Sequence, residues 1–179
     1  MRWLEVNSSK PLNGKIKAPG SKNSSLALMA ASCLADEPVH ISNVPDISDI
    51  RVVVKILTSI GAVVTQEGGS YTIDPRSIHT AMIDPGLSSS FRAAYYFIGA
   101  LLAKHGAVSI GYPGGDNFVS RPIDQHLKGL KALGASITMF DDHYLVEADS
   151  LTGTEIFFDV VTCGATINVM LAAVLAKGK

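Results

Sequence analysis

Three short polar clusters of this sequence combine residue types that bind anions. They read GSKNSS at 20–25, SSSFR at 88–92 and TCGAT at 162–166, and each precedes an Ala- and Leu-rich stretch. A helix N-terminus presents unpaired N–H groups and about half a positive charge, so it favours anions. Lys22 and Arg92 are locally unfavourable there unless a phosphate or carboxylate binds beside them. We therefore expect an anion site; for either residue alone, a solvated side chain beside a simple helix cap is the alternative.

A further candidate lies in the stretch YPGGDNFVSRP at 112–122, which places a carboxylate between a Gly-Gly pair and an arginine. Read alone, Asp116 is a turn residue whose carboxylate bonds its own backbone. The alternative is an acid that a loop brings to a substrate, where it can transfer a proton. The sequence contains no GxxxxGK[ST] or GxGxxG pattern, which excludes a nucleotide P-loop and a Rossmann fingerprint.

The composition is that of an ordinary globular protein. The chain has 179 residues, 47% hydrophobic and 17% charged, with a formal net charge of −1. This argues against disorder and gives no sign of a nucleic-acid-binding surface. Cys33 and Cys163 fit no close-spaced metal or redox motif, so we expect two reduced, buried thiols. Residues 1–20 hold no apolar run long enough for a signal sequence or membrane span, which favours a cytoplasmic protein.

The elements that must position these clusters occur twice. Residues 24–64 and 93–137 both read as an Ala- and Leu-rich helix, a short strand, a loop with proline, an amphipathic helix and another strand. The pair Leu-Ala at 34–35 recurs at 102–103 and 175–176. Such repeats indicate stacked or ring-arranged units around a common core, in an α/β fold.

Helices and strands follow from the apolar patterns. The segments 24–35, 93–104 and 165–177 are apolar on nearly every side, so we expect them inside the fold. Two other helices carry one apolar stripe each. Their stripes are Ile50, Val53, Val54 and Leu57, with Asp46 or Ser48 as cap and Gly61 at the end, and Ile123, Leu127, Leu130 and Leu133, ended by Gly134. Strands are expected at 39–44, 107–112, 135–140 and 143–148, with hairpin joints at 67–73 and 140–145.

A third copy begins at VTCGATINVMLAAVLAKGK, residues 161–179, where the sequence ends before the strand that follows in the first two copies. We interpret the last repeat as incomplete. A truncated chain is the favoured reading, and completion by another polypeptide is the alternative.

Four long collinear stretches carry a family resemblance. They are LNGKIKAPGSKNSSLALMAASCLADEPVHISNVPDISDI, FRAAYYFIGALLAKHG, PGGDNFVSRPIDQHLKGLKALGA and GATINVMLAAVLAKGK. The chain resembles the UDP-N-acetylglucosamine enolpyruvyl transferases over nearly all of its length. The sister family that makes 5-enolpyruvylshikimate-3-phosphate shares the fold, but Lys-Asn at 22–23 and RPIDQHLKGL at 121–130 look like the UDP-sugar branch.

The resemblance implies an inside-out α/β barrel lobe built from pseudo-repeats, with buried helices and outer sheets. Residues 1–20 would form an opening strand segment that packs with a second lobe, and 21–85 and 86–150 would be the complete repeats. Residues 151–179 would be the incomplete third repeat, and the C-terminal lobe is absent. In the family that lobe supplies the proton-abstracting base and further arginines, so we expect the fragment alone to be inactive.

The implied reaction moves the enolpyruvyl group of phosphoenolpyruvate to the 3-hydroxyl of UDP-N-acetylglucosamine and releases phosphate, the first committed step of peptidoglycan synthesis. It needs a proton on the methylene carbon while the hydroxyl attacks C2, and it requires no metal or cofactor. The expected partners are these two small molecules and the absent lobe, with no nucleic acid and no membrane. A catalytically inactive UDP-sugar-binding module, and a 5-enolpyruvylshikimate-3-phosphate synthase-like transferase, are the alternatives.

Residue roles follow from the same resemblance. Lys22 and Asn23 match positions that contact phosphoenolpyruvate and the sugar nucleotide, and Arg92 matches one that binds the UDP-sugar. Arg121 matches an arginine that meets both substrates, where a planar fork suits bidentate anion binding. The positions around the uridine are matched by Pro122, Ile123, Asp124 and Gln125. Further UDP-contacting positions are matched by Thr162 and Cys163. Val160 stands where many members carry lysine, so one phosphate contact is expected to be missing.

Asp116 stands on the family's mobile loop, where most members carry cysteine and some carry aspartate. The role implied for it is proton donor, together with Lys22 and Arg121 in the catalytic set. An aspartate with an ordinary pKa of about 3.9 is ionised at neutral pH, so this role needs a pKa raised by about three units. We also expect resistance to fosfomycin, an epoxide that alkylates the loop cysteine, because a carboxylate is a weaker nucleophile.

Overall fold

The computed structural model describes residues 3–112, 114 and 122–179. The first part of the chain contains α1 (Lys22–Ala31), η1 (Ser32–Leu34), β1 (Val39–Ile41), α2 (Ser48–Ser59), β2 (Val63–Glu67) and β3 (Ser70–Asp74). The second contains α3 (Pro85–Ser89), η2 (Arg92–Tyr95), α4 (Tyr96–His105), β4 (Ala107–Gly111), α5 (Asp124–Ala132), β5 (Ser136–Met139), β6 (His143–Glu147) and α6 (Cys163–Ala173).

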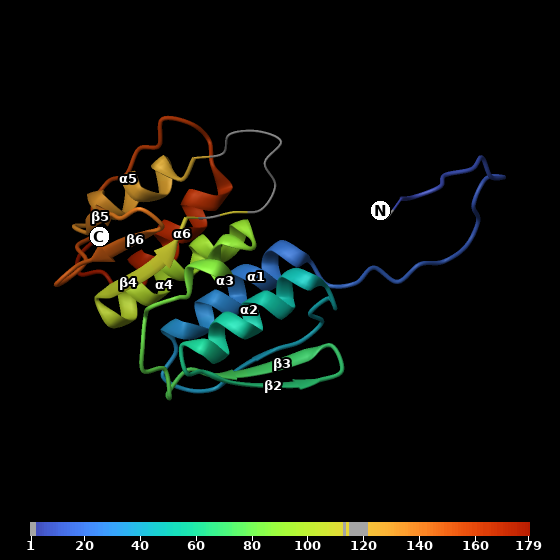
Figure 1. The fold of residues 1–179 in the computed structure, drawn as a ribbon, viewed down its shortest axis with the longest axis horizontal. Helices are drawn as coiled ribbons and strands as arrows, with labels where there is room; N and C mark the ends of the chain where they lie inside the picture. The colour runs from blue at the N-terminus through green and yellow to red at the C-terminus, as the bar shows by residue number, and fades with distance from the viewer. Residues whose placement is uncertain (1–2, 113, 115–121) are drawn as a thin grey trace.

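The described strands form two antiparallel sheets with equivalent strand orders, β1-β3-β2 and β4-β6-β5. In each sheet the central strand, β3 or β6, alternates between buried and less buried residues, so one face packs on the core. The strands β2 and β5 are largely exposed. The sheets therefore lie at the outside, as Figure 1 shows, and the expected inside-out arrangement of repeated units is confirmed.

The central helix is α4, whose residues Tyr96–Leu102 are all buried. It packs against α1 and most closely against α6. At their meeting point a side chain on Gly99 would collide with the backbone of Asn168, so the close approach requires glycine. The flanking helices α1 and α6 each keep one apolar side exposed to solvent. Leu28 of α1 is 53% exposed and Met170 of α6 is 62% exposed. Full burial of an Ala- and Leu-rich helix is thus confirmed for α4 and only partial for α1 and α6.

The apolar stripes of α2 and α5 face the core, and both helices end near the expected glycines, Gly61 and Gly134, which have positive φ. The expected cap of α2 is wrong. Ile47 occupies the N-cap position without a side-chain bond, and the Asp46 carboxylate instead accepts a hydrogen bond from Arg51 at 2.7 Å. The Asp46 carboxylate is bonded to Arg51 and lies one position before the N-cap, so it does not cap the unpaired N–H groups at the start of the helix.

Strand and helix bounds differ from the sequence expectations in two further ways. The first strand is only β1, three residues long, since the chain turns away at Asn43, which has a positive φ of 56°. The helix α3 was not expected at all. Its start is set by Asp84, whose carboxylate accepts a hydrogen bond from the Leu87 N–H at 2.9 Å, and by proline in the first turn.

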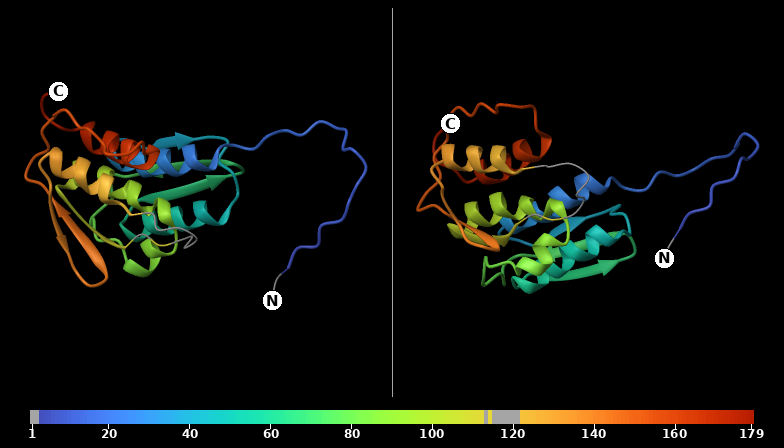
Figure 2. Two further views of the ribbon diagram at one scale, coloured as in Figure 1. Left: turned by 90° about the horizontal axis from the view of Figure 1, so that it is seen from above. Right: turned by 45° about the horizontal axis from the view of Figure 1, so that its top comes forward.

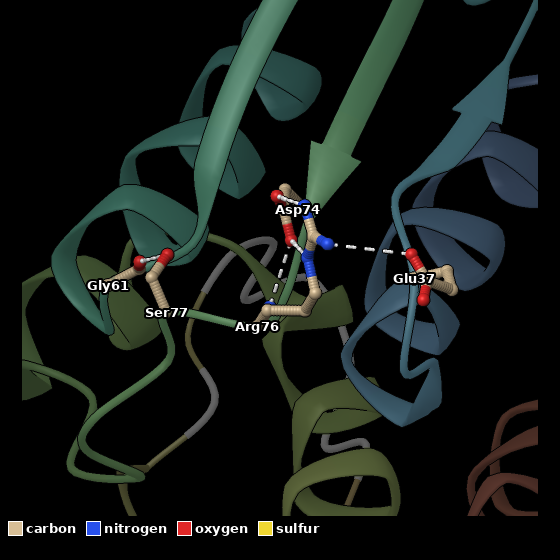
Figure 3. Close-up of polar contacts among 5 residues, drawn as sticks. All are labelled: Glu37, Gly61, Asp74, Arg76 and Ser77. Carbon is tan, nitrogen blue, oxygen red and sulfur yellow. Dashed lines mark hydrogen bonds and ion pairs between the residues drawn. The ribbon is translucent and has the colours of Figure 1, made fainter.

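An arginine ties the ends of the first sheet together (Figure 3). The Arg76 guanidinium donates to both carboxylate oxygens of Asp74, at 2.9 and 2.7 Å, and lies 3.5 Å from a Glu37 oxygen, at the approach to β1. The next residue, Ser77, donates its hydroxyl to the Gly61 carbonyl at 2.7 Å. These bonds fix the segment of the chain that follows β3 and leads to α3.

The N-terminal segment 3–20 is extended and runs away from the helices (Figures 1 and 2). Its apolar side chains face solvent; Leu4, Leu12 and Ile16 are each at least 94% exposed. Among the described residues, no helix is both long and apolar enough to cross a membrane.

Candidate functional site

The first polar cluster forms the start of α1 as expected. The Ser21 hydroxyl caps the helix by accepting a hydrogen bond from the Ser24 N–H at 3.4 Å, which places exposed Lys22 and Asn23 in the first turn. Lys22 Nζ lies 3.3 Å from a carboxylate oxygen of Asp49, on α2. The charge conflict that the sequence predicts at this helix end is therefore relieved within the protein, by a carboxylate that the neighbouring helix supplies.

The second cluster differs from its expected form, because Arg92 begins the 3-10 helix η2 after an extended residue, Phe91. Arg92 is partly buried, and its guanidinium donates to the Pro122 carbonyl at 3.5 Å. The same guanidinium lies 5.8 Å from the centre of the Tyr95 ring, a cation–π distance. The structure thus brings together Arg92 and Pro122, two predicted site residues that are distant in the sequence.

The start of α5 contributes the residues expected around the uridine. Ile123 is buried, whereas Pro122 and Asp124 are exposed. Gln125 is only 7% exposed, and its amide nitrogen donates to Asp124 at 2.9 Å and to the Asp159 carboxylate at 3.1 Å. The Gln125 side chain is therefore directed at the segment before α6.

The third cluster forms the start of α6. The Thr162 hydroxyl caps the helix by accepting a hydrogen bond from the Ala165 N–H at 3.3 Å. Cys163, in the first turn, is exposed, so the expectation of a buried thiol is wrong for this cysteine and confirmed only for Cys33. The first turn of α6 lies at the surface and leaves the Cys163 side chain uncovered. Val160 is 60% exposed beside this turn.

Tyr95 and His126 connect these helix starts, and sequence reasoning missed both. Their rings meet edge to face at 4.2 Å between centroids. A methyl group built on Gly164 would lie 2.7 Å from the Tyr95 hydroxyl and 3.2 Å from His126 Nε2, so both side chains touch the first turn of α6. Arg92 and the α6 N-terminus consequently lie against the same tyrosine.

A buried polar network supports this region. Burial lowers the pKa of His126 from its ordinary 6.5 to about 4, and the positive charge of Arg92 acts in the same direction. The Asn168 amide lies 3.2 Å from His126 Nδ1 and is itself fully buried. The signal that could have revealed Asn168 is an amide within the apolar helix CGATINVMLAA, because a buried amide must find hydrogen-bonding partners.

Two predicted catalytic residues, Asp116 and Arg121, lie outside the described residues. In the part of the chain that the structure describes, no group of three or more His, Cys, Asp or Glu side chains is arranged to hold a metal ion.

The model of the EPSP synthase (3-phosphoshikimate 1-carboxyvinyltransferase) family matches residues 6–179. The chain belongs to this enolpyruvyl transferase family. It is 44% identical over 178 residues to UDP-N-acetylglucosamine 1-carboxyvinyltransferase 3 of Caldanaerobacter subterraneus subsp. tengcongensis, covering 99% of this chain and 43% of that protein. It is also 44% identical over 179 residues to UDP-N-acetylglucosamine 1-carboxyvinyltransferase 2 of Geobacillus kaustophilus, covering 100% and 42% respectively. The chain therefore spans less than half the length of these curated relatives.

Solved structures confirm the enolpyruvyl transferase fold. The enolpyruvyl transferase NikO from Streptomyces tendae superposes with a TM-score of 0.79 at 23% identity, over 93% of this chain and 40% of that one. EPSP synthase from Acinetobacter baumannii superposes with a TM-score of 0.71 at 18% identity, over 92% of this chain and 39% of that one. At these identities the likeness concerns the fold alone.

Proposed function

We propose that this chain is the N-terminal portion of an enzyme that transfers the enolpyruvyl group of phosphoenolpyruvate to the 3-hydroxyl of UDP-N-acetylglucosamine. The observation that carries the proposal is the convergence of Arg92 and the α6 N-terminus on Tyr95, with Pro122 beside them. A guanidinium and a helix N-terminus are both suited to phosphate groups. The names of the 44% identical relatives support UDP-N-acetylglucosamine as the acceptor.

In the proposed reaction the 3-hydroxyl oxygen forms a bond to C2 of phosphoenolpyruvate while the methylene carbon takes up a proton. The hydroxyl proton passes to a base. The new methyl group of the tetrahedral intermediate then returns one proton to the conjugate base of the proton donor, and phosphate is expelled by C–O cleavage. We assign Asp116 as the proton donor, Lys22, Asn23 and Arg121 to phosphoenolpyruvate, and Arg92 to the UDP-sugar. The UDP-sugar contacts are completed by Lys22, Asn23, Arg121, Pro122, Ile123, Asp124, Thr162 and Cys163. The base and further arginines come from a C-terminal lobe.

This function places the enzyme in the cytoplasm, at the entry to peptidoglycan synthesis, on which cell shape and division depend. A second candidate is a transferase acting on shikimate 3-phosphate, which the description of the matching family model favours. A third is an inactive UDP-sugar-binding module, since the chain covers only 43% and 42% of the two catalytic relatives.

Calorimetric titration of the chain separates these candidates. We expect UDP and UDP-N-acetylglucosamine to bind, and Arg92→Ala to weaken both at least about tenfold, because a lost charge-assisted hydrogen bond costs about 1.5–3 kcal/mol. Arg51→Ala, which removes an exposed arginine paired with Asp46, is the matched control and should bind normally. Preferential binding of shikimate 3-phosphate, or no binding of UDP, contradicts the proposal. Phosphate release from phosphoenolpyruvate by the complete enzyme then distinguishes an active transferase from a binding module.

A further inference from the structure

Gln125 holds the segment that leads into α6 by a two-point contact. Its side-chain carbonyl oxygen accepts a hydrogen bond from the Asp159 backbone N–H at 3.0 Å, and its amide nitrogen donates to the Asp159 carboxylate at 3.1 Å. The glutamine is 7% exposed, so water competes little for these bonds. Lys128 contacts the same carboxylate from the exposed side, at 2.6 Å. One side chain of α5 thereby fixes both the backbone and the side chain of Asp159.

The next residue, His126, holds α6 itself. The Asn168 side-chain oxygen accepts a hydrogen bond from the Gly99 N–H at 2.8 Å, so its amide nitrogen must be the donor toward His126 Nδ1 at 3.2 Å. His126 Nδ1 is therefore unprotonated and the hydrogen of the neutral ring lies on Nε2, the ring nitrogen beside Gly164. Asn168 links α4, α5 and α6 through these two bonds.

Packing leaves little room for these elements to move independently. A methyl group on Gly129 of α5 would lie 2.3 Å from a Val169 carbon on α6 and 3.3 Å from the Phe158 ring. With Gly164 similarly close to Tyr95 and His126, both ends of the contact exclude any side chain. The position of α5 thus determines where the first turn of α6 stands relative to Arg92.

We propose that Gln125 and His126 are positioning residues, which hold residues 159–164 against Arg92 and Tyr95 and so shape the site for a nucleoside diphosphate. The inference rests on the proposed function and assigns the Gln125 side chain to the protein rather than to the uridine. Its amide makes three hydrogen bonds, to Asp124 and twice to Asp159, which leaves it little capacity for a ligand.

The test uses steady-state kinetics of the complete enzyme with both substrates varied. We expect Gln125→Ala to raise KM for UDP-N-acetylglucosamine about tenfold, a loss of about 1.4 kcal/mol, and to change KM for phosphoenolpyruvate less than about twofold. Lys128→Ala removes only the exposed contact to Asp159 and should change both KM values less than about twofold. An unchanged KM for the UDP-sugar in Gln125→Ala, or an equal rise for both substrates, overturns the inference.

Exchanging the donor and the acceptor in the hydrogen bond between Gln125 and Asp159 should restore KM for the UDP-sugar. Gln125→Glu places a carboxylate opposite Asp159 and should raise KM for the UDP-sugar as much as Gln125→Ala, because two acceptors then face each other. Adding Asp159→Asn supplies a donor, and the double variant should recover KM to within about threefold of the wild type. Failure of the double variant to recover, in a protein with native circular dichroism, overturns the positioning role.

Hydrogen exchange separates failure of this inference from failure of the proposed function. Gln125→Ala should speed exchange of the amides in 159–164 in the absence of any ligand, and Lys128→Ala should not. If exchange responds in this way but the wild-type enzyme does not use UDP-N-acetylglucosamine, only the proposed substrate is wrong. Unchanged exchange in Gln125→Ala shows that Gln125 does not hold the segment.

Discussion

Single residues of the same type stand in opposite environments here, as the two cysteines illustrate. Cys33 is 1% exposed and burial raises its thiol pKa to about 12, whereas Cys163 is exposed at the start of α6. We expect iodoacetamide to modify Cys163 in the native chain and Cys33 only after unfolding, since the thiolate is the reactive form. Peptide mass spectrometry locates the adducts. Equal modification of both thiols in the folded chain contradicts this expectation, and bound UDP-N-acetylglucosamine should slow the reaction at Cys163.

His126 should make the stability of the chain depend on pH. Its pKa is about 4 in the folded protein against an ordinary 6.5, so between these values the unfolded state binds more protons. The free energy of unfolding should therefore fall as pH drops from about 6.5 to about 4, by at most about 3.4 kcal/mol. Urea denaturation across this range measures the slope.

Two variants test that assignment. His126→Phe should reduce the slope without abolishing it, since burial also lowers the pKa of His105, and should lower the free energy of unfolding at neutral pH by about 1–3 kcal/mol, because the Asn168 amide loses a buried partner. His40→Phe removes an exposed imidazole and should keep the slope of the wild type. An unaltered slope in His126→Phe shows that another group is responsible.

Asp116 gives the prediction that most directly concerns the proposed chemistry. The complete enzyme with Asp116 should resist inactivation by fosfomycin, and Asp116→Cys should keep turnover and gain time-dependent inactivation, because a thiolate opens an epoxide far faster than a carboxylate. Asp116→Ala should lose turnover. Rapid inactivation of the unmodified enzyme, or near-normal turnover of the alanine variant, contradicts the assignment.

At the scale of elements, the packing of η2 and α5 against α6 depends on glycine at the first turn of α6. A side chain at Gly164 meets the Tyr95 hydroxyl at 2.7 Å, so Gly164→Ala must displace either the ring or the helix. We expect a loss of about 1–3 kcal/mol in the free energy of unfolding and weaker binding of UDP in calorimetry. Gly14→Ala, where an added methyl group meets no neighbour within 4 Å, is the control and should be neutral. Normal UDP binding by Gly164→Ala would show that the start of α6 is not part of the site.

At the scale of the whole molecule, the core does not depend on the N-terminal segment. Residues 3–19 are all exposed. The segment first contacts the folded part of the chain at Gly20, which lies against Asn43. Deleting residues 1–17 should therefore change the free energy of unfolding of the chain by less than about 0.5 kcal/mol. Chemical denaturation of the shortened and full chains measures this, and a large loss of stability would show that the segment packs on the helices.

Sequence reasoning located the repeated elements because their signals are local. The stripe of α2, the hairpin joint within 67–73 and the polar clusters at the starts of α1 and α6 each depend on residues within one or two turns. The error at the start of α2 arose because Arg51, five residues further along the chain, holds the Asp46 carboxylate that the sequence offered as a helix cap.

The sequence alone determined the repeated α/β units and the polar clusters at the helix starts, since these depend on residue order and apolar period, and its family resemblance implied the inside-out arrangement. Only the tertiary structure decided which side chains meet there. Tyr95, His126 and Asn168 lie on different helices, and no spacing in the sequence predicts their contacts. Such contacts depend on helix approach distances, which here are set by glycines at positions 99, 129 and 164 that admit no side chain.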